Sequence, residues 1–175
     1  KMAIRDELLQ ELDQEARATR RLLERVPDSR LGWKPHDKSM TLGQLALHIA
    51  TTPGGVAAMA SQDTRDVRPG TFVQPAAQSA TELVPALEQS LAQAKAVISA
   101  MDDATMRETW TLKNNGEVVM AIPRMSVLRV IMLNHWYHHR GQLSVYLRQL
   151  DVPIPSIYGP SADENPFAVA AGTGV

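Results

Sequence analysis

Three of the five histidines in this chain lie within ten residues, in the stretch NHWYHHRGQL at positions 134–143. The residues just before this stretch are mainly Val, Ile, Leu and Met, as in an apolar helix. A buried imidazole needs a partner for each ring nitrogen, so packing alone rarely satisfies a group of three. We therefore expect the cluster to lie at the surface, to join a hydrogen-bond network or to bind a metal ion.

The spacing within this cluster favours one pair. His135 and His139 are four residues apart, so they share one face of a helix and can reach a single ion, as in helical zinc motifs. Exposed or hydrogen-bonded histidines also occur at this spacing, so the pair alone is weak evidence for a metal. His138 points about 100° away from His139, and a regular helix cannot aim all three imidazoles at one ion.

A third ligand must come from another element, and His48 is the candidate. It lies in the apolar stretch LGQLALHIATT, where a lone histidine is usually a core residue bonded to a backbone carbonyl. Together with the pair at positions 135 and 139, however, it could present three neutral imidazoles inward from two helices and leave one coordination position open. His36 lies in a polar loop, where we expect it to face solvent.

Two glutamines are candidates for orienting the ligands, and no catalytic residue can be assigned. Gln142 follows His139 by three residues on the same face, although it could equally be a polar residue at the end of the bundle. Gln44 lies one turn before His48, but Thr41 and Gln44 also have the spacing of a helix capping box.

Four stretches with helical periodicity must position these side chains. The first covers residues 4–26, and the second begins at Thr41 and should kink or restart at Pro53. The third carries an apolar seam over 84–101, and the fourth runs from about residue 124 to 150. Asn115-Gly116 predicts a short β-hairpin between the third and fourth. We therefore predict an all-α four-helix bundle with long connections, formed by a single domain over residues 1–175 with a peripheral tail at 164–175.

Composition narrows the function further. Eighteen basic and nineteen acidic residues give a net charge of −1, which argues against nucleic-acid binding. The chain has no cysteine and therefore no thiolate ligand, disulfide or cysteine nucleophile. No apolar run approaches the roughly 20 residues of a membrane span, so we expect a cytoplasmic protein. The fourth stretch is apolar on more than one side, which suits a homodimer, although the sequence does not choose between monomer and dimer.

Two long motifs resemble the DinB/YfiT family of metalloenzymes: LGWKPHDKSMTLGQLALHIA at 31–50 and HWYHHRGQLSVYLRQLDVPIPSIYGPS at 135–161. The resemblance covers roughly residues 2–163. It implies a four-helix bundle with a three-histidine site for a divalent metal, commonly nickel or zinc. Carried onto this sequence, the ligands are His48, His135 and His139, and His138 is a neighbour. This chain departs from better-studied relatives at 53–55, where Pro-Gly-Gly follows soon after the first ligand.

The resemblance also implies an activity, because characterised relatives are thiol S-transferases or thiol-dependent isomerases that use low-molecular-weight thiols such as bacillithiol or mycothiol. We expect a transferase that joins such a thiol to a small electrophilic substrate. Since the chain has no cysteine, the sulfur must arrive with a cosubstrate. Two alternatives remain open: a metal-dependent hydrolase at the same site, for which no general base is evident, and a metal-binding or ligand-binding bundle without turnover.

Overall fold

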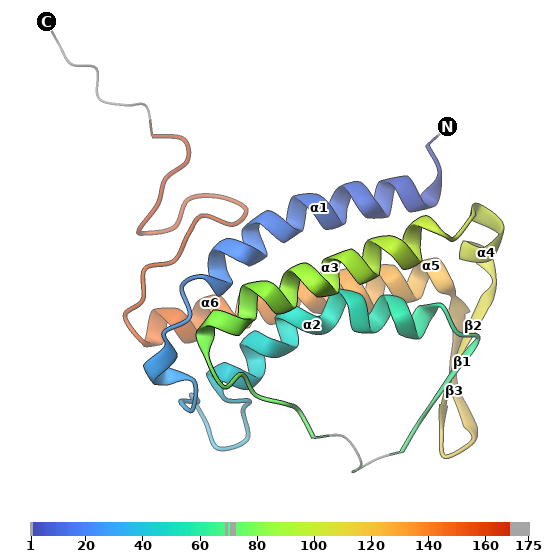
Figure 1. Cartoon of the computed structure of the whole chain (residues 1–175), viewed down its shortest axis with the longest axis horizontal. Helices are drawn as coiled ribbons and strands as arrows, with labels where there is room; N and C mark the ends of the chain where they lie inside the picture. The colour runs from blue at the N-terminus through green and yellow to red at the C-terminus, as the bar shows by residue number, and fades with distance from the viewer. Residues whose placement is uncertain (1, 69, 71–72, 169–175) are drawn as a thin grey trace, which may run out of the picture.

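The helices of this protein lie side by side as a bundle, with a small sheet at one end (Figure 1). The computed structural model describes residues 2–68, 70 and 73–168. The elements are α1 (Ile4–Leu23), η1 (Asp28–Arg30), α2 (Leu42–Ala60), β1 (Thr64–Val67), η2 (Ala80–Glu82), α3 (Leu83–Ser99), α4 (Asp103–Arg107), β2 (Thr109–Asn114), β3 (Glu117–Pro123), α5 (Arg124–Ser126), η3 (Val127–Asn134) and α6 (His135–Gln149). The predicted four-helix bundle with long connections is confirmed. Residues 169–175 of the predicted tail lie outside the described residues.

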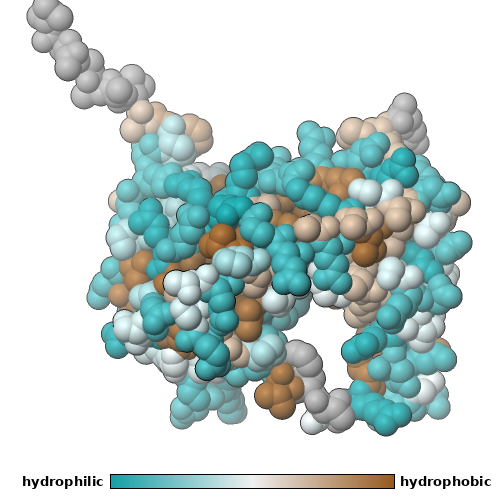
Figure 2. Space-filling view, viewed as in Figure 1, coloured by the Kyte–Doolittle hydropathy of each residue, from teal (hydrophilic) through white to brown (hydrophobic). Residues whose placement is uncertain are grey.

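The core forms where the apolar stripes of the helices meet. Leu12 and Leu22 of α1 and Leu87 and Ile98 of α3 are fully buried, as the helical spacing predicts. Each such side chain stabilises the fold by about 1.5–3 kcal/mol through the apolar surface that it removes from water. The face seen in Figure 2 is mainly hydrophilic, with hydrophobic residues in small groups between polar ones. In the described part of the chain, no helix combines the length and apolar character needed to cross a bilayer.

Helix α2 begins as predicted and is not interrupted at Pro53. The Gln44 N–H donates to Thr41 Oγ1 at 3.2 Å and the Thr41 N–H donates to Gln44 Oε1 at 2.9 Å, which completes the capping box. The helix then continues through Pro53 to Ala60, so the alternative of a restart at the proline is wrong. Close packing against α3 supports this segment, since the Gly54 N–H donates to Ser90 Oγ at 2.8 Å.

The predicted fourth helix has a finer structure than a single α-helix. The helical run from residue 124 to 149 contains a π-helix, η3, between α5 and α6. A π-helix closes its hydrogen bonds over five residues and has a wider turn, so it changes which residues share a face before and after it. Its last residue, Asn134, directly precedes His135. The histidine pair therefore begins where regular α-helix resumes.

The sheet contains the predicted hairpin and one strand that was not predicted. β2 and β3 pair antiparallel around Asn115 and Gly116, whose φ angles of 51° and 86° are the positive values that a tight two-residue turn requires. β1 adds parallel to β2 on its other side. Buried Arg124 joins the sheet end to α2, because its guanidinium donates to the Ala60 carbonyl at 2.7 Å and pairs with Asp63.

Candidate metal centre

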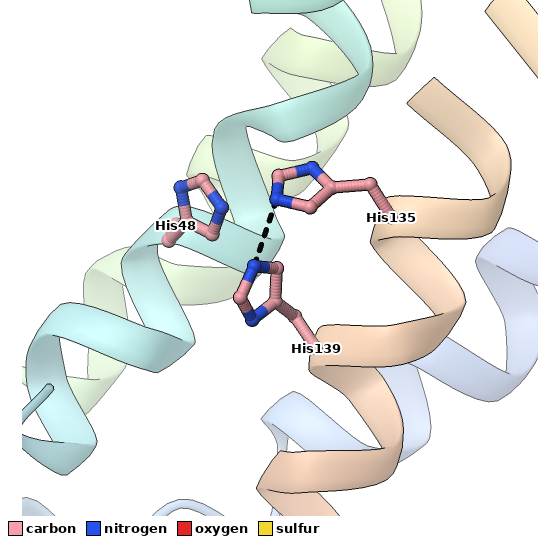
Figure 3. A group of neighbouring side chains, drawn as sticks. All are labelled: His48, His135 and His139. Atoms are coloured by element: carbon pink, nitrogen blue, oxygen red, sulfur yellow. Dashed lines mark hydrogen bonds between the residues drawn. The ribbon is translucent and has the colours of Figure 1, made fainter. Parts of the chain in front are cut away.

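The structure brings His48 of α2 together with His135 and His139 of α6 (Figure 3). One nitrogen from each ring lies within 4.8 Å of the corresponding nitrogens of the other two. His135 Nε2 and His139 Nε2 are only 2.8 Å apart, and the His48 ring centroid lies 4.6 Å from that of His139. The three rings thus converge from two helices on a common point, as the sequence analysis predicted.

All three imidazoles are half-buried, and their surroundings favour the neutral form. Burial, and to a smaller extent repulsion from the neighbouring His139 and His135 rings when charged, lowers the pKa of His48 to about 4. Burial also lowers the pKa of His135 and of His139. At neutral pH the rings therefore have free lone pairs, which is the form that binds a metal ion.

Gln142 fixes the orientation of one ring. His139 Nδ1 lies 2.7 Å from Gln142 Oε1, and because an amide oxygen can only accept, Nδ1 must carry the proton. The lone pair of His139 is then on Nε2, the nitrogen that faces His135. Metal-binding histidines typically show this arrangement, with one nitrogen free for the ion and the other donating to an oxygen. The donor set fits a divalent metal ion, and the contact of Gln142 with His139 is compatible with the orienting role, which stays a prediction.

The remaining candidate residues lie apart from this trio. The Gln44 side chain bonds to the Thr41 N–H and to the Gln74 carbonyl at 3.2 Å, and neither bond reaches His48. His138 is exposed, and the centroid of its ring lies 5.0 Å from the centroid of the His139 ring. His36 is also exposed, and its Nδ1 accepts from the Lys38 N–H at 3.1 Å. The orienting role considered for Gln44 therefore has no contact with His48 behind it, and His138 and His36 lie outside the histidine cluster.

A buried ion pair holds α6 against α1 beside the histidines. Arg140 is 1% exposed, and its guanidinium donates to the Glu15 carboxylate at 2.5 Å and to Thr19 Oγ1 at 3.2 Å. The Tyr158 hydroxyl from the C-terminal segment donates to the same carboxylate at 2.8 Å. Sequence reasoning missed Glu15, because a glutamate in an amphipathic helix is expected to face solvent.

No Asp or Glu among the described residues joins the histidine cluster. The site therefore combines three neutral nitrogen donors with an amide, and it has no carboxylate close to the point where the rings converge. Such a set is suited to holding a Lewis-acidic cation, and among the described residues it includes no carboxylate that could act as a general base.

Comparison with known proteins agrees with this architecture. The model of the DinB family matches residues 2–166, nearly the whole chain. The chain belongs to the DinB family. It is 29% identical over 163 residues to YrdA of Bacillus subtilis strain 168, described as an uncharacterized protein, with 91% of this chain and 90% of that protein covered.

Two crystal structures of DinB-like proteins share the fold. One, from Bacillus cereus ATCC 10987, has a TM-score of 0.68 at 22% identity, covering 87% of this chain and 97% of that one. The other, from Bacillus subtilis, has a TM-score of 0.62 at 17% identity, covering 83% and 92%. At these identities the likeness establishes the bundle fold of this DinB protein, and its activity must be argued from the site.

Proposed function

We propose that this DinB protein is a divalent-metal-dependent enzyme that transfers a low-molecular-weight thiol to a small electrophilic substrate. His48, His135 and His139 would hold the metal, nickel or zinc. The observation that carries the proposal is the convergence of three neutral imidazoles from two helices, one of them oriented by Gln142. The proposal also draws on the family, whose characterised members the sequence motifs resemble.

The chemistry follows from the donor set and from what the chain lacks. A divalent cation held by three neutral imidazoles keeps its positive charge and, when bound, lowers the pKa of a thiol or water that it coordinates. Metal-dependent hydrolases commonly place a carboxylate general base beside the bound water, and the described residues place no carboxylate in the cluster. Thiol transfer needs only a nucleophile, which must come from a cosubstrate because the chain has no cysteine. The site therefore favours thiol transfer over hydrolysis.

The proposal is tested by thioether formation with metal-loaded protein. The protein is loaded separately with Ni²⁺ and Zn²⁺ and offered bacillithiol, mycothiol or glutathione together with a small alkyl or aryl halide. A carbon–sulfur bond forms, halide leaves, and the thiol proton passes to the buffer. Mass spectrometry of the product should show metal-dependent turnover that His139→Ala abolishes and His138→Ala keeps. His138 is the matched control, because it is the adjacent histidine and lies outside the cluster.

A different pattern would contradict thiol transfer. Wild-type protein that binds the metal but leaves every thiol and electrophile unchanged would be a metal-binding bundle without turnover. Metal-dependent cleavage of esters or amides without any thiol would instead make the site hydrolytic.

A further inference from the structure

Pro53 leaves a carbonyl on α2 without its helical donor. In an α-helix the Ile49 carbonyl accepts the N–H of residue 53, and proline has none. Ile49 is fully buried, so water cannot easily replace that donor. An unpaired buried carbonyl costs about 1–3 kcal/mol, and such groups are therefore nearly always bonded.

The missing donor comes from the other helix of the site. The Trp136 indole Nε1–H donates to the Ile49 carbonyl at 2.8 Å, a normal hydrogen-bond length. Trp136 is 1% exposed, so the bond is shielded from water and well defined. Ile49 follows His48 in the chain and Trp136 follows His135, so this bond joins the two helices one residue away from a histidine on each.

We propose that Pro53 and Trp136 are a positioning pair that sets how His48 of α2 lies relative to His135 and His139 of α6, and thereby sets the affinity of the site for its metal. The inference rests on the metal site proposed above. A metal ion demands ligand nitrogens in a narrow range of positions, and groups that fix the ligands commonly change affinity by 10-fold to 100-fold. The indole has a single N–H donor, and Pro53 leaves the single Ile49 carbonyl without a helical donor. This hydrogen bond therefore forms at only one relative position of α2 and α6.

The chain offers a matched control for Trp136. Trp110 is also fully buried, and its Nε1–H also donates to a carbonyl of α2, that of Met59 at 3.2 Å. This second bond lies near the C-terminal end of the helix, at a residue 11 positions after His48 and so roughly 16–17 Å from it along the axis at 1.5 Å per residue. Trp136→Phe and Trp110→Phe therefore make the same chemical change, near the histidines and away from them.

The experiment measures the metal directly. Full-length wild type, Trp136→Phe and Trp110→Phe are titrated with Zn²⁺ in competition with a chromophoric chelator, and the Co²⁺-loaded forms are compared by visible absorption, which reports coordination geometry. We expect Trp136→Phe to raise the Zn²⁺ Kd by about 10-fold or more and to shift the Co²⁺ bands. Trp110→Phe should leave the Kd within about twofold, although both variants lose one buried indole hydrogen bond.

Pro53→Ala provides a second test that does not depend on deleting the indole. It restores an N–H for the Ile49 carbonyl, so the bond from Trp136 is no longer needed to satisfy it. In the Pro53→Ala background, Trp136→Phe should then change the Zn²⁺ Kd by less than about threefold, a coupling that two independent residues would not show.

The outcomes separate this inference from the proposed function. Wild-type binding of Zn²⁺ with an unchanged Kd and unchanged Co²⁺ spectrum in Trp136→Phe would overturn the positioning pair and leave the metal site standing. An equal loss of affinity in Trp136→Phe and Trp110→Phe would overturn it as well, because a general loss of stability would then explain both. A wild type that binds no metal would overturn the proposed function and this inference together.

Discussion

Acidification of the metal-free protein should weaken the fold over a pH range set by the histidine cluster. His48 has an ordinary pKa of 6.5 in an unfolded chain and a pKa of about 4 in the folded protein, chiefly because of burial. Between these two values the unfolded chain binds a proton that the folded protein does not. The free energy of unfolding must therefore fall as the pH falls from 6.5 toward 4.

The size of the effect follows from the same two values. One pKa unit corresponds to about 1.4 kcal/mol, so between neutral pH and about pH 5 the His48 contribution reaches at most about 2 kcal/mol. Water still reaches part of the ring, and we therefore expect about 1 kcal/mol from His48 itself. The lowered pKa values of His135 and His139 act in the same direction.

Urea unfolding followed by circular dichroism measures this contribution. The metal-free protein is examined with a chelator present at several values from about pH 7.5 to pH 5, which stays above the range where most carboxylates titrate. Wild type is compared with His48→Gln and with His36→Gln, the latter changing an exposed histidine. The loss of stability on acidification should be smaller in His48→Gln and unchanged in His36→Gln. A wild type whose stability stays level over this range, or an equal loss in His48→Gln, would refute the reasoning.

Two further predictions concern the groups that hold the histidines. Gln142→Leu removes the acceptor of the His139 Nδ1 proton and should weaken Zn²⁺ binding about 10-fold to 100-fold, measured by competition with a chelator. An unchanged Zn²⁺ affinity would exclude the orienting role of Gln142. Glu15→Ala leaves the buried Arg140 without its carboxylate and should lower the free energy of unfolding by about 3–5 kcal/mol in urea. Glu88→Ala breaks an exposed pair and should cost less than about 1 kcal/mol, so equal losses in the two variants would contradict the ion-pair argument.

The features that could be predicted from the sequence depend on residues close together in the chain. The Thr41 capping box, the hairpin at Asn115-Gly116 and the shared face of His135 and His139 each follow from spacing alone. His48 could be named as the third ligand only together with that pair, since an isolated histidine on an apolar helix has several explanations, and the family resemblance supports the same choice.

The features that could not be predicted depend on contacts between distant segments. Pro53 shows in the sequence that a carbonyl is left without its donor, but nothing local indicates that Trp136 supplies one from 87 positions away. Glu15 as the partner of Arg140 is likewise a contact between α1 and α6. The π-helix before His135 has no simple sequence pattern, because its residues, VLRVIMLN, would also fit an α-helix.

Metal content shows whether His48, His135 and His139 bind one metal ion. The wild type and the variants His48→Ala, His139→Ala and His138→Ala are purified without a histidine tag. Each protein is reconstituted with Ni²⁺ or Zn²⁺ and freed of excess metal. Its metal content is then measured by inductively coupled plasma mass spectrometry. We expect about one ion per chain in the wild type and in His138→Ala, and little in His48→Ala and His139→Ala. No metal in the reconstituted wild type, or equal metal in all four proteins, would contradict it.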